Sequence, residues 1–402
     1  MRNSQRFSRR NLKNSYLRNK NQYHAKDLDD ACFRVSKQIY SNNFTFGPIG
    51  TSAAKGKSVY QIQSLRDQLV LEKINDNLKR AYNIDIPSRD GVVDQVDILL
   101  KENFPKEIVR LDIKSCFESI KPDRLLKKVG NDGLVTRDTL YYLRQFFERS
   151  KEAGAQGLPR GVSVSSTLLE IALIEFDHTL RRMPNVYYYG RFVDDIIVFC
   201  TKDSLKTVHE ARKRLQNIGL FLNESGEKFK VVDATKSKSN IGVERFSYLG
   251  YQFEIPLAYL RSKDVRVKIA SEKINKVKTR IVRSYIAYSK DQDYSLLKDR
   301  LRFLMGSSPV YSGGGIKTKV KNGLPWSYKN INDYSQLKEL DKFHCKIVYC
   351  GKGSLYNKYI SMVGALNKKE LSSFSFYKSF FLSPIFDFSL NKVTKIMRGF
   401  RE

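Results

Sequence analysis

Two neighbouring carboxylates, Asp194 and Asp195, follow the run Tyr188–Phe192 and precede the apolar run Ile196–Phe199. Two carboxylates side by side repel each other and are costly to crowd together without a cation. Mg²⁺ relieves that cost, since it prefers carboxylate oxygen and keeps coordination positions open for phosphate. An ordinary Asp-Asp turn is the plainer interpretation of the pair by itself, so other residues must decide between the two.

A third carboxylate, Asp112, follows the run Ile108–Leu111 and stands 82 residues before Asp194. A single Asp at the end of a strand is usually a cap or a turn residue. Three carboxylates around a pair of ions, however, are what in-line phosphoryl or nucleotidyl transfer requires, because one ion activates the attacking oxygen and the other supports the leaving group. Glu118 is an alternative ligand, although a short helix would turn it elsewhere.

The elements that must position these acids are predicted from local pattern. Val, Ile, Phe and Tyr on both sides of Asp194 favour extended chain, so we expect a β-hairpin with the two acids at its tip. A buried strand is expected to run into Asp112, followed by a turn and a short helix. Small residues at 154–166 lead into an apolar helix at 167–176, and the glycines there would let backbone approach a ligand. A simple helix-capping loop is the alternative.

The spacing of apolar residues predicts helices at 26–40, 65–78 and 90–103, and a strand at 58–64. The segment 121–150 is mixed and largely helical.

The composition indicates a polyanionic partner. The 402 residues include 72 Lys and Arg against 42 Asp and Glu, a formal charge of +30, with 12% aromatic residues and a pI near 9.8. This balance favours nucleic acid as the partner, although a merely basic soluble protein shows the same charge. The five cysteines include no CxxC pair, so neither a disulfide framework nor a zinc site is expected.

We expect a reduced, intracellular protein. No apolar run reaches the roughly 18 residues of a membrane span, and no apolar core follows the basic N-terminus as it would in a signal peptide. Residues 2–20 hold seven basic residues and no acid. This charge run predicts a mobile arm that orders on nucleic acid, and a merely solvated tail is the alternative.

Six separated pieces of the chain are similar to the characteristic blocks of reverse transcriptases. In chain order they are Ser58–Val70 (fingers strand and helix), Leu111–Phe117 (first palm block), Gln156–Ser165 (template grip), Phe192–Asp195 (catalytic hairpin), Gly219–Asn223 with Lys228 (the block near the pyrophosphate) and Phe246–Tyr251 (primer grip). They span about residues 55–255. The sequence of the first palm block most resembles that of the bacterial anti-phage defence reverse transcriptases. Among them, it is most similar to the smaller member of systems that pair two reverse transcriptases with a noncoding RNA.

The resemblance implies a role for each matching acid. Asp112 and Asp194 would hold two Mg²⁺ ions, with Mn²⁺ as an alternative metal. Ile113 would belong to the same metal site, and Asp195 would complete the cluster. Lys228 would be the general acid close to the pyrophosphate; Lys230 is a competing candidate, and a plain solvated lysine is the alternative for each.

The resemblance also implies contacts to the nucleotide and the template. Phe117 stands where the family keeps an aromatic ring that clashes with a ribose 2′-OH, which implies selection of deoxynucleotides; plain core packing is the alternative. The other residues implied to border the nucleotide or the template are Lys57, Arg66, Gln156, Gly157 and Arg160. Three positions depart from the family pattern, since Ser58 replaces the usual triphosphate-binding Arg, Arg160 replaces the common Gln, and Phe192 replaces the usual Tyr. The gap from Asn223 to Lys228 is also longer than the usual one.

Two regions are implied to hold the nucleic acid. The primer-grip hairpin would contact it through Tyr248, Leu249 and Gly250. A basic helix of the thumb would follow the duplex backbone through Lys273, Lys276, Arg280 and Arg283, unless these residues form only a solvated face. Aromatic residues at 326–334 could stack single-stranded bases, but a place in the core is the preferred interpretation.

The implied fold is α+β, a right-hand polymerase with fingers, a palm of antiparallel strands and a helical thumb. Its expected parts are a basic N-terminal arm at 1–25, fingers at 26–105, a first palm part at 106–125, a fingers or palm insertion at 126–155, the remaining palm at 156–258, and the thumb with a C-terminal extension at 259–402.

The function expected is RNA-directed DNA synthesis, from dNTPs to a DNA product on a noncoding RNA template, in the bacterial cytoplasm and in defence against phage. A second reverse transcriptase subunit or another copy of the chain is an expected partner, and a membrane is not. Protein-primed or template-independent synthesis at the same site is one alternative. A non-catalytic RNA-binding scaffold is another, and the three intact aspartates count against it.

Overall fold

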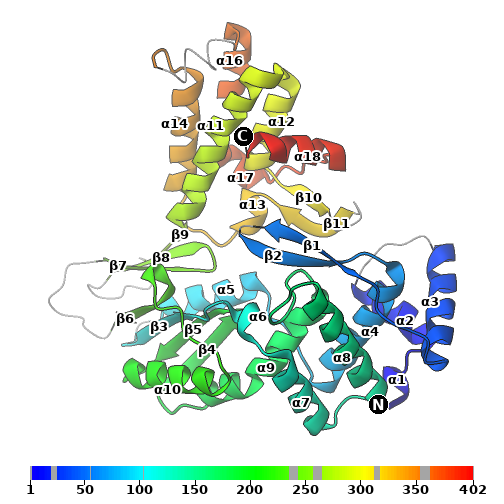
Figure 1. The fold of residues 1–402 in the computed structure, drawn as a ribbon. Helices are drawn as coiled ribbons and strands as arrows, with labels where there is room; N and C mark the ends of the chain where they lie inside the picture. Colours follow the sequence, from blue (N-terminus) through cyan, green and yellow to red (C-terminus); the bar gives the residue numbers. More distant parts are fainter. Residues whose placement is uncertain are drawn as a thin grey trace. The chain divides into compact units, whose positions relative to one another are not determined.

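The computed structural model describes residues 2–19, 25–54, 56–102, 104–234, 243–256, 265–311, 317–353 and 363–401 (Figure 1). The chain divides into two compact units. Unit 1 comprises Met1–Val92 and Phe104–Lys236, and unit 2 comprises Val93–Asn103 and Ser237–Glu402. Each unit has its own sheets and helices, so each is described by itself.

The main sheet of unit 1 has four antiparallel strands in the order β4-β5-β3-β6. The strands are β3 (Glu107–Asp112), β4 (Val186–Phe192), β5 (Asp195–Cys200) and β6 (Lys230–Asp233). The two central strands, β5 and β3, are almost wholly buried, which explains their nearly continuous apolar sequence. The hairpin expected around Asp194 and the buried strand expected before Asp112 are both present.

Helices pack around α4 (Leu65–Ala81) and against the sheet of unit 1. The other elements of this unit are α1 (Arg2–Gln5), α2 (Arg9–Asn19), α3 (Ala25–Tyr40), β1 (Ile49–Ala54), β2 (Lys57–Ile62), α6 (Cys116–Ser119), α7 (Pro122–Asp132), α8 (Arg137–Glu152), α9 (Ser163–Arg181), α10 (Ser204–Asn217) and the 3₁₀ helix η1 (Gly226–Lys228), while α5 (Arg89–Leu100) runs from unit 1 into unit 2. α9 packs against both α4 and β4, and α10 packs against α9 and β3. α9 thereby connects the helical part of the unit to the strand that leads to Asp194.

The N-terminal segment is not the mobile arm expected for it. Phe7, Leu12 and Tyr16 are at most 1% exposed, and α2 packs against α3 and α4. Leu12 and Tyr16 stand four residues apart and therefore share one face of a helix. Apart from Leu17, the other residues of α2 are basic or polar, so the short apolar stripe is not apparent from the charge of the segment.

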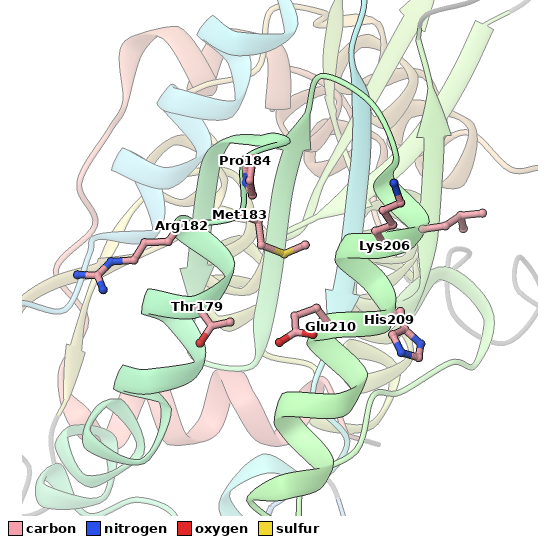
Figure 2. Close-up of a pocket in the computed structure, with 8 residues that line it drawn as sticks. Thr179, Arg182, Met183, Pro184, Lys206, His209 and Glu210 are labelled. Carbon is pink, nitrogen blue, oxygen red and sulfur yellow. The ribbon is translucent and has the colours of Figure 1, made fainter.

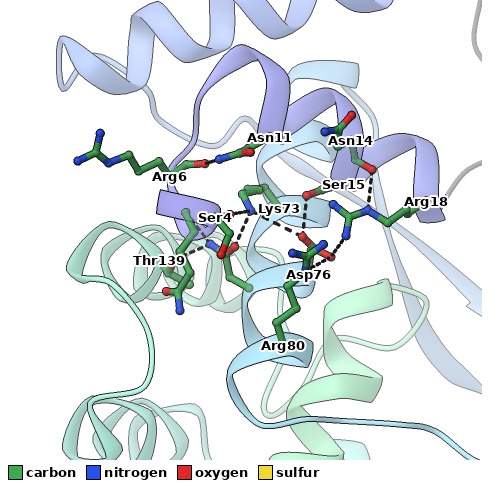
Figure 3. A network of polar contacts seen from close by, with 12 residues as sticks. Ser4, Arg6, Asn11, Asn14, Ser15, Arg18, Lys73, Asp76, Arg80 and Thr139 are labelled. Carbon is green, nitrogen blue, oxygen red and sulfur yellow. Dashed lines mark hydrogen bonds and ion pairs between the residues drawn. The ribbon is translucent and has the colours of Figure 1, made fainter. Parts of the chain in front are cut away.

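A buried polar network fastens these N-terminal helices to α4 (Figure 3). The Lys73 ammonium donates to the Ser4 carbonyl at 2.7 Å and to Asn77 Oδ1 at 2.6 Å. The Ser15 hydroxyl donates to Asp76 Oδ2 at 3.0 Å. Burial lowers the pKa of Lys73 to about 8. Because buried polar groups are costly unless they are hydrogen-bonded, this network fixes how the N-terminal helices lie on α4.

Unit 2 has a three-stranded antiparallel sheet in the order β7-β8-β9 and a separate hairpin of β10 and β11. Its elements are β7 (Val243–Tyr248), β8 (Tyr251–Pro256), β9 (Arg266–Ile269), α11 (Ser271–Asp291), α12 (Tyr294–Met305), β10 (Ser308–Tyr311), β11 (Lys317–Asn322), α13 (Leu324–Ser327), α14 (Ser335–Val348), α16 (Ala365–Ser372), α17 (Phe376–Leu382) and α18 (Leu390–Gly399). The long helix α11 packs against α12, α14 and α18 (Figure 1). No helix in the described ranges combines the length and the apolar character that a bilayer crossing needs.

The strand β9 was not expected from the sequence. Val265, Val267 and Ile269 are all buried, whereas the residues between them are basic and more exposed. This alternation is the period-2 pattern of a strand with one buried face. It was overlooked because the basic helix α11 follows directly and shares the same composition.

Candidate active site

The two adjacent aspartates lie at the turn between β4 and β5. Phe192 pairs with Asp195, so the turn itself has only two residues, Val193 and Asp194. Val193 has a φ of +61°, in the left-handed region that a β-branched residue rarely adopts. Such a conformation costs on the order of 1–3 kcal/mol and persists only where the surrounding structure holds it. The turn that presents the acids is therefore under backbone strain.

Asp112 lies directly beside this turn. The register of β3 with β5 pairs Asp112 with Asp195, and the Ile113 N–H donates to the Asp194 carbonyl at 3.0 Å. The Cα atoms of paired residues in an antiparallel sheet lie about 4.5–5.5 Å apart. The three aspartates that were expected to share a site are thus brought together at one end of the sheet.

Protein nitrogens contact two of the three carboxylates. Lys228 Nζ lies 2.7 Å from Asp112 Oδ2, and Asn223 Nδ2 lies 3.0 Å from Asp112 Oδ1. Arg110 Nη2 lies 3.2 Å from Asp195 Oδ1. Lys228 was expected near this site, whereas Arg110 was not. The sequence did hold a signal for Arg110, because residues two apart on a strand point to the same face.

The electrostatics of the site favour a bound cation. Burial, and then the charges of Asp195 and Asp112, raise the pKa of Asp194. Burial also raises the pKa of Asp195, against the opposing charges of Lys228 and Arg110. Burial acts to lower the pKa of Lys228, but its hydrogen bond to Asp112 and the charge of Asp195 outweigh burial and raise that pKa. A cation between the carboxylates would remove the repulsion among them.

The donor chemistry of the three aspartates fits Mg²⁺, which binds carboxylate oxygen. The Ile113 carbonyl is a further oxygen at the same place, and none of the backbone hydrogen bonds around Ile113 uses it. Among the residues that the structure describes, no group of three or more His, Cys, Asp or Glu side chains has the spacing of a ready metal site. The contacts with Lys228 and Arg110 account for this, because each directs a carboxylate toward a nitrogen.

Arg191 anchors the hairpin to α9. Its guanidinium donates two hydrogen bonds to Asp177, at 2.6 and 2.9 Å, and two to Glu170, at 2.5 and 3.0 Å. A further hydrogen bond runs from Arg191 Nη1 to the Val193 carbonyl at 2.9 Å and supports the strained turn. The Tyr189 hydroxyl donates to Asp177 Oδ1 at 2.6 Å. The sequence analysis missed this cluster, although Glu170 and Asp177, seven residues apart, do share a face of α9.

Phe117, Glu118 and Arg160 form a second cluster at α6. The Arg160 guanidinium lies 4.9 Å from the ring centroid of Phe117 and makes two hydrogen bonds to Glu118, at 2.5 and 3.0 Å. Lys57 Nζ lies 3.9 Å from the same carboxylate. The hydrogen bond from Arg160 lowers the pKa of Glu118. Arg160 and Lys57 both contact Glu118 in this structure, and their expected contact with a nucleotide stays a prediction.

The loop before α9 packs tightly against α6. A Cβ on Gly157 would lie 2.5 Å from the carbonyl oxygens of both Phe117 and Glu118, and the Leu158 N–H donates to the Phe117 carbonyl at 2.8 Å. The close approach that the glycines of this loop were expected to allow to a ligand is, at Gly157, an approach to protein backbone. Gln156 is exposed at the start of the loop.

The Arg66 side chain contacts neighbouring residues within the helical part of unit 1. It donates to the Thr45 carbonyl at 2.6 Å, pairs with Asp67 at 3.3 Å, and lies 5.0 Å from the ring centroid of Phe44. Its side chain is 37% exposed. The role of Arg66 in nucleotide binding stays a prediction.

The hairpin expected to grip the primer lies in unit 2. Leu249 and Gly250 form the two-residue turn between β7 and β8, with φ of +48° and +81°. Positive φ at both central residues is typical of the type I′ turn of tight hairpins. Tyr248 was expected to contact nucleic acid, but its side chain is fully buried in unit 2.

The cationic face expected on α11 is present only in part. Lys276 is exposed, and Lys273 Nζ lies 2.7 Å from the carboxylate of the preceding glutamate. Arg283 donates to the Phe400 carbonyl at 2.7 Å, and the Arg280 guanidinium lies 5.3 Å from the Phe400 ring centroid. Burial lowers the pKa of Arg280. These two arginines contact the residue that follows α18, and their expected contact with nucleic acid stays a prediction.

A surface hollow of about 620 Å³ lies where α9 ends and α10 begins (Figure 2). Met183, Pro184 and Leu205 supply its apolar lining, and Arg182 and His209 stand at its sides. None of the three aspartates lines it. The size of a cavity is therefore a poor guide to the chemistry of this unit.

Residues 60–253 match the family described as "Reverse transcriptase (RNA-dependent DNA polymerase)". No curated protein matches the chain. Among solved structures the chain is similar to apo telomerase from Candida tropicalis truncated from its C-terminal domain, at 16% identity and a TM-score of 0.38, over 56% of this chain and 55% of that one. It is also similar to telomerase from Candida albicans in complex with a TWJ fragment of telomeric RNA, at 14% identity and a TM-score of 0.38, over 90% of this chain and 58% of that one. The chain spans little more than half the length of these telomerases.

The matched residues include the three aspartates, the loop before α9, and the β7–β8 hairpin as far as Phe253. The fold class is α+β with a right-hand polymerase fold, as expected, and the acids lie on its antiparallel sheet. Over residues 60–253 the chain is therefore a reverse transcriptase domain, the domain of RNA-dependent DNA polymerases.

Proposed function

We propose that this chain is an RNA-directed DNA polymerase that adds dNTPs to a 3′ hydroxyl. The observation that carries the proposal is the meeting of Asp112, Asp194 and Asp195 at one end of the sheet, inside the matched residues. In the reaction the hydroxyl loses its proton and its oxygen bonds to the α-phosphorus of the dNTP. The bond from that phosphorus to the bridging oxygen breaks, and pyrophosphate leaves.

Asp112 and Asp194 would hold two Mg²⁺ ions, with Asp195 and the Ile113 carbonyl beside them. When bound, such ions supply an activated attacking oxygen and charge for the leaving group. The chain's own residues keep the carboxylates in place, since the sheet register fixes Asp112 and the contacts of the hairpin with α9 fix the turn. Lys228, at 2.7 Å from Asp112, would balance the charge of the departing pyrophosphate and protonate it.

The surroundings of the acids supply the proposed nucleotide and template contacts. Phe117 is half-buried on α6, where a ring can exclude a 2′-hydroxyl, and Arg160 packs over it. Lys57, Gln156 and Gly157 border the same cluster or its loop. In this proposal the expected fingers and palm parts correspond to unit 1 together with the β7–β8 hairpin, and the thumb to the helices from α11 onward.

The proposed setting is defence of a bacterium against phage, in the cytoplasm, with a noncoding RNA as template. The amino-acid sequence of the motifs supports this setting, and the formal charge of +30 supports RNA and DNA as partners. A second reverse transcriptase subunit or another copy of the chain is the proposed protein partner. Protein-primed or template-independent synthesis, and an RNA-binding scaffold without activity, are the alternatives that the experiment separates.

Primer extension tests the proposal. Purified protein is given labelled dNTPs and Mg²⁺, with and without an RNA template and primer. We expect a DNA product that requires the template and that Asp194→Asn abolishes. Asp203→Asn is the matched control, because Asp203 is an exposed aspartate that precedes α10 and pairs with Lys206 at 2.7 Å. This variant should retain full activity.

Each other outcome favours a different function. DNA made equally well without template indicates untemplated or protein-primed synthesis at the same site. RNA binding without any product, in Mg²⁺ and in Mn²⁺, indicates the scaffold. Equal loss of product in Asp194→Asn and Asp203→Asn would mean that the assay reports folding and not the acids.

A further inference from the structure

A pocket of about 500 Å³ opens in unit 2, and none of the residues assigned to catalysis lines it. It lies where β9 begins, where the chain enters α14, and at the first turn of α17 (Figure 1). Its volume is in the range of sites that hold small ligands. The residues that decide its chemistry are Arg266, Asn332, Asp333, Tyr334, Lys338 and Tyr377.

Hydrogen bonds fix one wall of the pocket. The Asn332 side chain accepts from the Val267 N–H at 2.7 Å and donates to the Val265 carbonyl at 2.9 Å. The Asn332 N–H also donates to the Val267 carbonyl at 3.1 Å. Asn332 thus takes the place of a neighbouring strand along the edge of β9. This wall is rigid before any ligand arrives.

Aromatic rings form the opposite wall. The Tyr334 ring centroid lies 6.5 Å from that of Tyr377 and 4.9 Å from that of Phe381, with interplanar angles of 85° and 55°. Both tyrosines are half-buried, and Phe381 is 54% exposed. Edge and tilted contacts of this kind hold the rings in place.

The charge around the pocket is positive. Arg266 and Lys338 are exposed, and no ion pair is recorded for either one among the described residues. Lys338 Nζ lies 5.1 Å from the Tyr377 ring centroid. The carboxylate that lines the pocket, Asp333, is already committed, since it accepts from the Ser335 N–H at 2.9 Å and pairs with Lys268 at 3.4 Å. The combination of aromatic rings and exposed cations suits a flat anion as the ligand.

We infer that this pocket binds a nucleotide, with its base against Tyr377 and Tyr334 and its phosphate at Arg266 and Lys338. Base stacking on aromatic rings together with backbone contacts to cations is the usual way in which proteins hold single-stranded nucleic acid without sequence preference. The pocket is open at the surface. The inference goes beyond the proposed polymerase activity and does not depend on it.

Fluorescence anisotropy of the full chain with labelled single-stranded RNA and DNA of about ten nucleotides tests the inference. Tyr377→Ala should weaken binding by about 5- to 150-fold, the range of one lost stacking contact. The double variant with Arg266→Gln and Lys338→Gln should weaken binding at low salt. The slope of log K against log salt should become less negative by about 1.4. The matched controls are Tyr349→Ala and Lys346→Gln, an exposed tyrosine and an exposed lysine at the far end of α14. Both controls should bind as the unaltered chain does.

Photocrosslinking locates the contact independently of affinity, because other basic surfaces of this chain can also bind nucleic acid. An oligonucleotide with 4-thiouridine should crosslink to the peptides that contain Tyr334 or Tyr377. Unlabelled dATP that displaces the oligonucleotide from these peptides would identify a site for free nucleotides, and failure to displace it would identify a site for a strand. Unchanged binding in Tyr377→Ala together with no crosslink at either tyrosine would overturn the inference. A change in the sedimentation of Tyr377→Ala with unchanged binding of nucleic acid would also overturn the inference, because it would identify a protein contact.

Discussion

Loss of the Arg191 guanidinium is expected to loosen the hairpin that carries Asp194 and Asp195. The Arg191 side chain is 4% exposed, and those of Glu170 and Asp177 are each 13% exposed. Removing one member of such a buried cluster leaves charge without a partner, which typically costs 3–5 kcal/mol. Arg191→Met should therefore destabilise unit 1 by about that amount. Arg191→Lys should cost less, since a single ammonium keeps the charge but cannot repeat the bidentate pairing.

The conformation of the hairpin should also change, in addition to this loss of global stability. The bond from Arg191 to the Val193 carbonyl is one of the contacts that hold a strained turn, and that strain is on the order of 1–3 kcal/mol. When the contact is lost the turn can relax and carry Asp194 and Asp195 with it. Primer extension should then fall at least about tenfold at temperatures where the variant is still folded.

Hydrogen exchange read by mass spectrometry is the suitable measurement, because it reports each unit separately. Amides of β4 and β5 should exchange about 150-fold to 4,000-fold faster in Arg191→Met, as expected for about 3–5 kcal/mol. Amides of α11 in unit 2 provide the internal reference. Arg212→Met is the matched control, since Arg212 and Glu224 form an exposed pair, 41% and 53% exposed, worth at most about 1 kcal/mol. If Arg191→Met exchanged in β4 and β5 like Arg212→Met, the reasoning from the buried cluster would be refuted.

Three further changes follow from individual residues. Val193→Gly should raise the free energy of unfolding by about 1 kcal/mol in denaturant titrations, because glycine accepts a φ of +61°, and no gain should appear in Val193→Ala. Gly157→Ala should lower the melting temperature of unit 1 by several degrees, since its Cβ would lie 2.5 Å from two carbonyl oxygens, whereas Gly351→Ala, with no atom within 4 Å of its Cβ, should not. Lys73 has a pKa of about 8 in the folded chain against 10.5 in the unfolded one, so the unfolded state binds more protons between these values and stability should rise with pH across this window. Lys73→Met should remove that rise, by up to about 3 kcal/mol, and an identical pH profile in both proteins would contradict the assignment.

Local pattern was enough to predict the elements that carry the acids. Apolar runs on both sides of Asp194 predicted a hairpin, and the apolar run before Asp112 predicted a buried strand, because side-chain alternation and burial are written in neighbouring residues. The order of the motifs then implied that Asp112 and Asp194 meet. The structure confirms that meeting through the pairing of β3 with β5.

The partners of the site residues were decided by the tertiary structure. Arg191 meets Glu170 and Asp177 because α9 packs on β4 in one particular rotation, and Arg160 meets Glu118 because a loop folds back onto α6. Such contacts depend on the phase of a helix against its neighbour, which no short stretch of sequence encodes.

The same reason explains the wrong prediction of a mobile arm. Charge alone could not show that the basic residues of α2 surround an apolar stripe, or that Arg280 and Arg283 are directed to the residue after α18. The sequence by itself determined which residues can do the chemistry and which local elements carry them. The packing of distant segments decided which of those residues have protein partners and which remain open to a ligand.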